Sequence, residues 1–377
     1  MNPLVTFVVP CYKLAHLLPE CVNSILGQEF AEWELLVMDD CSPDNTPEVA
    51  RSFNDSRIKH IRNNPNLGHL RNYNKGIEMA RGKYVWLISA DDCLRGSEIL
   101  GRFVSVLEAR PSVGFIFCPG VGLQDSRETG LLKYSFHGDS DFVMGGRDFL
   151  TKRLLETNSV LAAAGMVRKT CYEKVGAFPL DMPYAGDWYM WCRFALEYDV
   201  AYMAEPGVCY RLHEQSMTSA LTKDARFVCV EDDLSLFWRV MQDASDLHLS
   251  DTARQLQFVL AREYCYYLKG PHRRSLEAVD FSFVEESIQR KARNPLESNR
   301  TLGQVFAQMG DESYWQGDYT RSLEFYQRSL AVESSIPGIR IKSYLLKTGS
   351  LGVWARSSLL SLRRSFARQS NRPRGLD

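Results

Sequence analysis

The sequence lacks the features that most directly assign a protein to a membrane, secreted or dinucleotide-binding class. No stretch reaches the roughly 18 apolar residues needed to cross a bilayer, and no basic region precedes the first apolar run. Neither a GxGxxG fingerprint nor a P-loop follows that run. We therefore expect a cytoplasmic protein without a signal peptide, in which any phosphate is bound through a cation and basic side chains.

Regularly spaced cysteines and a strong net charge are also missing. The ten cysteines form no CxxC pair, and several lie in apolar surroundings, which indicates free buried thiols in a reducing compartment. The formal net charge of the 377 residues is −1, so no global field would attract nucleic acid. With 45% hydrophobic and 24% charged residues, the chain has a soluble composition and enough length for two domains.

What is present in residues 1–118 is an alternation of short apolar runs and helical patterns. Strands are predicted at 5–9, 33–38, 57–61 and 84–88, and helices at 14–26, 46–53 and 70–79. This alternation is typical of βαβ units. We therefore predict an α/β fold with a mostly parallel central sheet flanked by helices.

Polar clusters follow three of the predicted strands, namely Cys11-Tyr12-Lys13, Asp39-Asp40 and Asp91-Asp92. Ligands of open parallel sheets bind beyond the carboxyl ends of the strands, so these clusters are candidate site residues. Two adjacent carboxylates at the end of a buried strand repel each other, and a divalent cation is the simplest relief. A solvated turn or a helix N-cap is the alternative for Asp91-Asp92.

Beyond residue 118 the pattern is less regular, with helices expected near 146–156 and 187–198 and a late strand at 208–211. From about residue 222 the chain is predicted to be helical. We expect an α/β domain at 1–220, a helical region at 221–337 and a basic tail at 338–377. Small residues seven apart within 310–330 indicate either one tetratricopeptide-like hairpin or a plain helical hairpin packed on the first domain.

The C-terminal tail is strongly basic. Residues 338–377 hold nine Lys and Arg and one Asp, so nine minus one gives a charge of +8. Residues 351–368 place Leu351, Trp354 and Phe366 among four arginines, which is typical of an amphipathic helix on an anionic membrane surface. A solvated helix or a frayed terminus is the alternative.

Several motifs occur in a specific order. They are Phe7 to Tyr12, Leu36 to Asp44, Asn66-Leu67-Gly68 with Arg71-Asn72, Gly82 to Asp92, and Ala185 to Trp188. In these motifs residues 4–215 resemble the family 2 glycosyltransferases, inverting enzymes with the two-lobed nucleotide-diphospho-sugar fold called GT-A. The chain departs from the family's usual residues at Cys11, Lys13 and Cys41, which affects the choice of donor more than the reaction.

The resemblance implies a site for a nucleotide-diphospho-sugar and a Mn²⁺ or Mg²⁺ ion. Asp92 would ligate the metal, and Asp91 would bind the ribose or the sugar, or help to orient the metal site. His213 would lie near the diphosphate or the metal, with a structural histidine as the alternative. Arg71 would contact the diphosphate, with a surface ion pair as the alternative.

The same resemblance places the nucleotide base at the ends of the first two strands. Pro10, Cys11 and Tyr12 would line the base, with Tyr12 stacking on it. Asp40 would accept a hydrogen bond from the base, with Asp39 nearby. The alternatives are that Tyr12 belongs to the core and that Asp40 caps the turn that follows it.

Asp187 is implied to be the general base, because an inverting transfer needs one carboxylate beside the attacking acceptor hydroxyl. It stands before a helical run, so an N-cap is the alternative and compatible role. Trp188 would form an apolar platform for an acceptor sugar, with core packing as the alternative.

The resulting hypothesis is an inverting, metal-dependent glycosyltransferase that uses a nucleotide-diphospho-sugar, with a UDP-type donor favoured. Its acceptor would be a saccharide or lipid-linked saccharide in bacterial cell-surface glycan assembly, and the tail would attach it peripherally to the inner face of the plasma membrane. The alternative is a non-catalytic nucleotide-sugar-binding or scaffold protein that acts through its helical region. A nucleotidyltransferase is disfavoured, since it usually needs a Gly-rich basic loop after the first strand.

Overall fold

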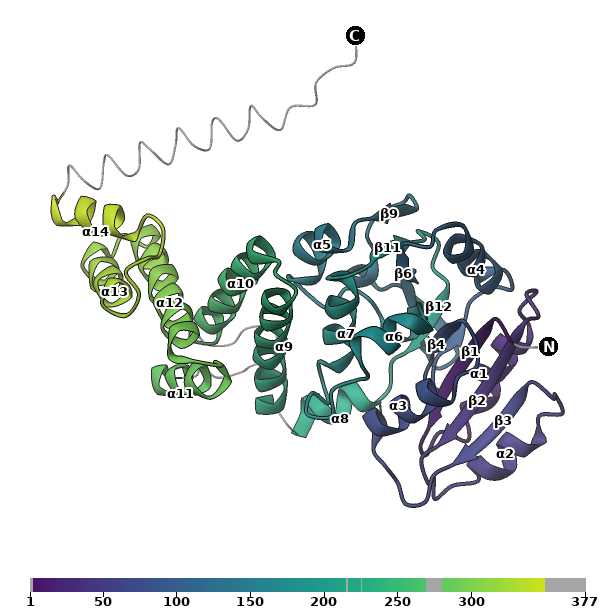
Figure 1. The fold of residues 1–377 in the computed structure, drawn as a ribbon. Coiled ribbons are helices and arrows are strands. Elements are labelled where there is room, and N and C mark those ends of the chain that lie inside the picture. Colours follow the sequence, from purple (N-terminus) through teal and green to yellow (C-terminus); the bar gives the residue numbers. More distant parts are fainter. Residues whose placement is uncertain (1–2, 215, 225, 269–279, 350–377) are drawn as a thin grey trace, which may run out of the picture. The chain divides into compact units, whose positions relative to one another are not determined.

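The computed structural model describes residues 3–214, 216–224, 226–268 and 280–349. The chain divides into two compact units, Met1–Ala253 and Arg254–Asp377 (Figure 1). The first unit therefore extends past the boundary expected at residue 220. The predicted amphipathic tail at 351–368 lies outside the described residues.

A mixed eight-stranded sheet forms the centre of the first unit. Its strand order is β3-β2-β1-β4-β10-β6-β11-β9. The parallel half contains β1 (Val5–Cys11), β2 (Trp33–Asp39), β3 (Ile58–Arg62) and β4 (Tyr84–Leu87). The other half contains β6 (Val113–Phe117), β9 (Phe142–Met144), β10 (Gly165–Arg168) and β11 (Asp199–Tyr202). The predicted α/β class with a central sheet and a C-terminal helical region is confirmed.

Strands β1, β2 and β4 are mostly apolar because both faces of the sheet are covered at these strands. Every residue of β1, β2 and β4 is buried, which is why these strands read as continuous apolar runs. Trp86 stacks between Phe7 and Phe103, with ring centroids 5.6 and 4.8 Å away. The covering helices include α1 (Leu18–Leu26), α2 (Thr46–Ser52), α3 (His69–Met79), α4 (Ile99–Ala109), α6 (Lys169–Val175) and α7 (Gly186–Ala195).

A smaller four-stranded sheet connects distant parts of the first unit. It has the order β5-β12-β7-β8, with β5 (Cys93–Leu94), β7 (Gly120–Gln124), β8 (Arg127–Leu131) and β12 (Val208–Arg211). β12 runs antiparallel to β5 and pairs Cys209 with Cys93. Because β5 directly follows Asp91-Asp92, this pairing brings the end of β12 beside the acidic pair.

The rest of the first unit is short turns and two further helices. The helix expected at 146–156 is a single turn, α5 (Gly146–Phe149), followed by a π-helical turn at Leu150–Leu154. Short 3-10 turns occur at Lys133–Ser135 and Ala162–Ala164. α8 (Met217–Asp224) and α9 (Arg226–Asp246) follow β12. They account for the extension of this unit beyond residue 220.

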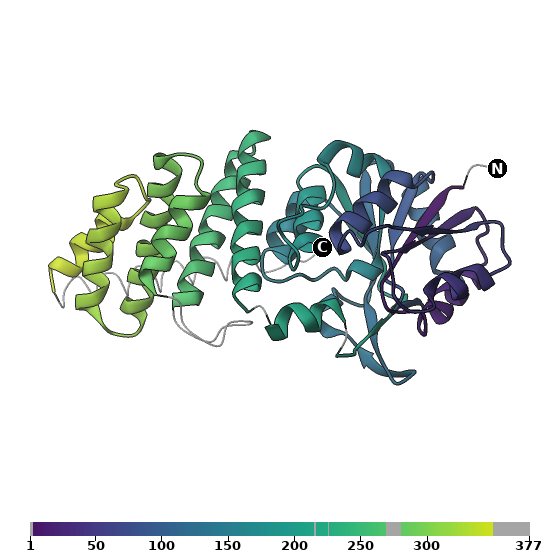
Figure 2. The same cartoon turned by 90° about the horizontal axis from the view of Figure 1, so that it is seen from below.

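The second unit is helical in its described part. After α10 (Ser250–Leu268) it contains α11 (Phe281–Lys291), α12 (Pro295–Trp315), α13 (Tyr319–Val332) and α14 (Ile339–Lys347). α12 and α13 form an antiparallel hairpin, in which the Ser322 and Ser329 hydroxyls donate to the carbonyls of Gly310 and Gly303 (Figure 2). The seven-residue spacing of small residues thus marks the face along which the two helices touch.

Among the residues that the structure describes, no helix combines the length and apolar character that a membrane crossing requires.

Candidate active site

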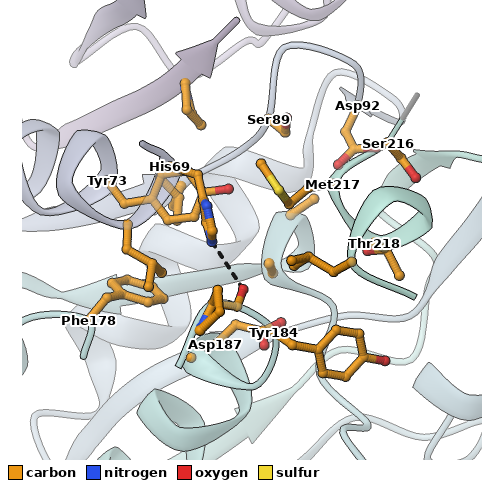
Figure 3. Close-up of a pocket in the computed structure, with 18 of the residues that line it drawn as sticks. His69, Tyr73, Ser89, Asp92, Phe178, Tyr184, Asp187, Ser216, Met217 and Thr218 are labelled. Atoms are coloured by element: carbon orange, nitrogen blue, oxygen red, sulfur yellow. Dashed lines mark hydrogen bonds between the residues drawn. The ribbon is translucent and has the colours of Figure 1, made fainter. Parts of the chain in front are cut away.

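A cavity lies beyond the carboxyl ends of β1 and β4, at the edge of the sheet where the strand-end rule predicts a site (Figure 3). β1 contributes Pro10, and the segment after β4 contributes Asp91 and Asp92. The first turn of α7 contributes Asp187, and α8 contributes Met217. Three of the predicted acidic residues therefore share one cavity.

Asp91 has one satisfied and one unsatisfied carboxylate oxygen. His213 Nε2 lies 2.9 Å from Asp91 Oδ2, whereas the buried Oδ1 has no hydrogen-bond partner among the described residues. Burial acts to raise the pKa of Asp91, but hydrogen bonds from His213 and Ser89 outweigh it and hold the pKa below its ordinary value. Asp91 is therefore an ionised carboxylate with a free buried oxygen, an arrangement that suits a ligand.

Asp92 is only 5% exposed and lies directly beside that charge. Its Oδ1 accepts a 2.9 Å hydrogen bond from the backbone N–H of Arg211. Burial and the negative charge of Asp91 raise the pKa of Asp92 well above its ordinary value. The side chain of Arg211 donates to the Asp91 carbonyl and pairs with Glu20, so it supports the loop and forms no salt bridge to the Asp92 carboxylate.

The acidic pair fits the chemistry of a hard divalent cation. Among the described residues, no group of three or more His, Cys, Asp or Glu side chains is arranged to hold a metal ion. Mg²⁺ and Mn²⁺ sites of nucleotide enzymes typically use one or two carboxylates and leave the other positions to water and phosphate. The unpartnered Oδ1 of Asp91 and the unfavourably buried Asp92 match that requirement.

Asp187 lies in the first turn of α7, two residues after the N-cap position. The N-cap residue is Ala185, so Asp187 is not the predicted N-cap. Its carboxylate accepts hydrogen bonds from Asn158 Nδ2 at 3.1 Å and from the Trp188 N–H at 2.7 Å. These contacts fix the side chain at the cavity wall, where Figure 3 shows it with Asp92.

The negative charges of the three carboxylates act on two tyrosines of the cavity. Tyr73 and Tyr210 line the same cavity. Burial first, and then the charges of Asp91, Asp92 and Asp187, raise the pKa of both phenols, to about 12 for Tyr210. Both hydroxyls therefore stay protonated at neutral pH and can donate hydrogen bonds to a bound ligand.

The residues predicted to line the nucleotide base differ in exposure at the end of β1. Tyr12 is 43% exposed, and Lys13 Nζ lies over its ring, 5.1 Å from the centroid. Cys11 is buried against Thr46, and its predicted side-chain contact with the base is wrong because β1 is covered on both faces. Arg71 is exposed on α3 and, within the described residues, has no ion-pair or hydrogen-bond partner, which excludes the surface ion pair.

Residues 6–166 match the family described as Glycosyl transferase family 2. This part of the chain belongs to glycosyltransferase family 2. The matched residues contain the ends of β1, β2 and β4 and therefore the acidic pair. Asp187 and His213 lie beyond the matched range.

The glycosyltransferase has relatives with and without assigned activities. An uncharacterised protein of Mycobacterium tuberculosis is 35% identical over 121 residues, which are 31% of this chain and 36% of that protein. The chain thus spans about a third of that relative. WfgD of Escherichia coli, named as a UDP-Glc:alpha-D-GlcNAc-diphosphoundecaprenol beta-1,3-glucosyltransferase, is 24% identical over 228 residues, which are 59% of this chain and 83% of WfgD.

Among solved structures, residues 1–349 of TarS from S. aureus, in complex with UDP-GlcNAc, share the fold of this glycosyltransferase. The TM-score is 0.56 at 16% sequence identity, over 93% of this chain and 92% of that one. At this identity the likeness concerns the fold alone.

The second acidic pair of the glycosyltransferase, Asp39-Asp40, is engaged within the protein. Asp39 is fully buried and binds the Ser42 N–H, His60 and Arg62, so it, and not Asp40, holds the turn at Ser42. Asp40 is also buried and accepts from Asn63 Nδ2 and from the N–H groups of Leu67 and Gly68. Neither lines the cavity, and both carboxylates hold the loops that follow β2 and precede α3.

Trp188 does not form the predicted acceptor platform. It is 2% exposed, donates from Nε1 to the Leu154 carbonyl and packs against Phe237 of α9, so no ring face is available to a sugar. The helical phase of α7 turns it inward. Tyr184, three residues before Asp187 in the sequence, is one of the aromatic residues that do line the cavity.

Sequence reasoning also missed the residues that support the site. Arg211 and Asn158 contact the acidic residues, whereas His69 lies in the cavity wall. The only sequence signal for Arg211 is its position at the end of the predicted strand 208–211, two residues before His213. Nothing in the sequence near Asn158 indicates a site.

Proposed function

We propose that this glycosyltransferase is an inverting, metal-dependent hexosyltransferase that uses a nucleotide-diphospho-sugar. The observation that carries the proposal is the shared cavity of Asp91, Asp92 and Asp187. It combines a pair of carboxylates suited to a metal–diphosphate with a separate carboxylate suited to proton removal. A metal-dependent inverting transfer uses both functions in one site.

The acidic pair serves the donor. Asp92, assisted by the free oxygen of Asp91, would hold Mn²⁺ or Mg²⁺ against the donor diphosphate. When bound, the ion neutralises the charge that grows on the leaving nucleoside diphosphate. His213 keeps Asp91 ionised by hydrogen bonding, and the exposed guanidinium of Arg71 is available to the phosphates.

Asp187 serves the acceptor. Its carboxylate, fixed by Asn158, would accept the proton of the acceptor hydroxyl as that oxygen attacks the anomeric carbon. The exposed ring of Tyr12 would stack on the nucleotide base. Tyr184 takes over the role of sugar platform that Trp188 cannot perform.

The relatives favour a UDP-type donor and a cell-surface glycan. TarS binds UDP-GlcNAc, and WfgD is named for transfer from UDP-Glc to a diphosphoundecaprenol-linked sugar. TuaG of Bacillus subtilis, 34% identical over 24% of this chain, is named for putative teichuronic acid biosynthesis. We therefore propose a saccharide or lipid-linked saccharide as the acceptor.

The proposal is tested by a screen of nucleotide-sugars for turnover with Mn²⁺, comparing the wild type with Asp187→Asn. We expect the variant to lose transfer and to keep UDP–Mn²⁺ binding in calorimetry. Asp181→Asn is the matched control, because Asp181 is an exposed carboxylate of the same segment and forms a surface pair with Arg239. Near-normal turnover by Asp187→Asn would exclude Asp187 as the base.

A lipid-linked acceptor would require access to a membrane surface. The +8 charge of residues 338–377, nine basic residues minus one acidic, supports peripheral binding to anionic lipids. Deletion of residues 351–377 is expected to release the enzyme from phosphatidylglycerol vesicles while leaving transfer to a soluble acceptor unchanged. Equal vesicle binding by both forms would exclude this role.

A further inference from the structure

The loop that leads into Asp187 is held from two sides by helices far away in the sequence. On one side His69 Nε2, at the start of α3, lies 3.0 Å from the Pro183 carbonyl (Figure 3, dashed line). On the other side Asp232 Oδ2, on α9, accepts hydrogen bonds from the N–H groups of Tyr184 at 2.6 Å and Ala185 at 3.2 Å. Three consecutive residues are therefore fixed just before the first turn of α7.

We propose that His69 and Asp232 form a clamp that positions the general base and Tyr184, and that Asp232 is a positioning residue for the transfer reaction. This inference rests on the proposed function of Asp187. Pro183, Tyr184, Gly186 and Asp187 all line the cavity, so a shift of this loop moves both the base and the aromatic ring beside it.

Asp232 anchors the residues that lead into α7, because its carboxylate binds the N–H groups of Tyr184 and of the N-cap residue Ala185. The N-cap residue Ala185 has no side chain to accept the free N–H groups at the start of the helix. Asp232 is 4% exposed, and a buried carboxylate bound to two N–H groups forms stronger hydrogen bonds than a neutral side chain would. The charge also lies near the N-terminal end of α7, where the helix dipole favours it.

His69 completes the clamp as a neutral donor. A carbonyl only accepts, so the hydrogen bond to Pro183 requires the proton on Nε2. Burial lowers the pKa of His69, which keeps the ring neutral at pH 7. Its ring also packs edge-on against Tyr73, with centroids 5.5 Å apart, so the donor is held in one orientation.

Asp243 provides a matched control on the same two helices. It lies on α9 and accepts from the Tyr189 hydroxyl at 2.9 Å, with Arg193 Nε at 3.6 Å. These contacts link α9 to α7 through residues that lie beyond the loop at 183–185. The Asp243 variant measures the effect on kcat of weakening the contact between α7 and α9 alone. The Asp232 variant measures that effect together with the loss of the contacts to the loop at 183–185.

The test compares Asp232→Ala and Asp232→Asn with Asp243→Ala. For Asp232→Ala we expect kcat to fall about 100-fold, because a displacement of about 1 Å at a catalytic group costs that much. The KM for the donor and the affinity for UDP–Mn²⁺ should stay within about twofold, since the acidic pair is untouched. Asp232→Asn keeps an acceptor oxygen without the charge, so its loss of kcat should be intermediate. Asp243→Ala should keep wild-type kcat.

A second readout does not depend on activity. Hydrogen–deuterium exchange of the Tyr184 and Ala185 amides should be faster in Asp232→Asn than in the wild type, and unchanged in Asp243→Ala. His69→Ala combined with Asp232→Asn should reduce kcat by less than the product of the single effects, because both act on one loop. If Asp232→Ala does not fold, Asp232→Asn decides the question.

Equal losses of kcat in the Asp232 and Asp243 variants, or unchanged exchange at Tyr184 and Ala185, would overturn the clamp. A wild-type enzyme that turns over no nucleotide-sugar would instead overturn the proposed function. In that case the exchange experiment still decides whether Asp232 holds the loop.

Discussion

The two acidic pairs of the first unit have the same composition and the same place at the end of a parallel strand, yet opposite surroundings. Asp39-Asp40 follows the core of β2 and is bound by Arg62, His60 and several N–H groups. Asp91-Asp92 follows β4 and has a buried oxygen with no partner in the described part of the chain, together with an unfavourable buried charge. The comparison teaches that satisfied carboxylates hold loops together, whereas under-satisfied ones are available to a ligand.

The largest expected effect concerns Asp91-Asp92, where the loss of one carboxylate should reduce enzymatic turnover. Asp92→Asn should reduce turnover about 1,000-fold, because several kcal/mol of metal-based charge stabilisation would be lost. The asparagine amide oxygen can still accept the hydrogen bond from the Arg211 N–H, so the fold should persist. The measurement is transfer rate at saturating donor and Mn²⁺. Retention of full turnover would remove Asp92 from the site.

The next effect is on stability at the first pair. Asp39→Ala should lower the free energy of unfolding by about 3 kcal/mol, because it leaves the buried N–H of Ser42 without its acceptor. Donor turnover per folded molecule should change far less than in Asp92→Asn. Urea unfolding together with kinetics distinguishes the two pairs. A stable but inactive Asp39→Ala protein would contradict the structural role.

A smaller change tests the loop that satisfies Asp40. Gly68 has a φ of 81° and donates its N–H to Asp40 Oδ2 at 2.9 Å. Nothing would clash with a new Cβ, so Gly68→Ala should cost about 2 kcal/mol through backbone strain alone. Gly101→Ala on α4 is the control, because its φ is ordinary and alanine favours a helix. Equal unfolding midpoints for both variants would exclude strain at Gly68.

The smallest expected effect is the pH dependence of stability at the second pair. The raised pKa of Asp92 means that its ionised form destabilises the folded state, so stability is lost as the pH rises from about 4 through the folded pKa. Asp92→Asn should therefore melt about 2 °C higher than the wild type at pH 8 without metal. The difference should shrink toward pH 4, and Mn²⁺ should stabilise only the wild type. A variant that melts lower at pH 8 would contradict this sign.

The fold of the first 118 residues could be predicted because its signals are local. Buried strands read as apolar runs, and amphipathic helices show their spacing within one segment. The first helix starts at Leu18, four residues later than expected, with Pro19 in its first turn. The turn-and-π-helix segment at 146–154 was predicted as one helix, since a π-helical turn has no distinct sequence signature.

The site was predictable where its residues follow strand ends or belong to the motifs that carry the family resemblance. The order of motifs brought Asp91, Asp92 and Asp187 into one candidate site, and the structure places them in one cavity. The difference between the two acidic pairs was not predictable, because it depends on partners supplied by neighbouring elements. The burial of Trp188 could not be predicted either, because it depends on the contact with Phe237 of α9.

The residues that bind Asp91 and Asp92 are translated long after the two carboxylates. The hydrogen bonds of Asp91 and Asp92 reach His213 and Arg211, which are 122 and 119 residues later in the chain. At ribosomal rates of about 5–20 residues per second, these partners are made roughly 6–24 s after the carboxylates. The nascent chain must therefore carry two adjacent charges at an unfinished sheet edge, which should delay closure of the first unit until β12 has been translated.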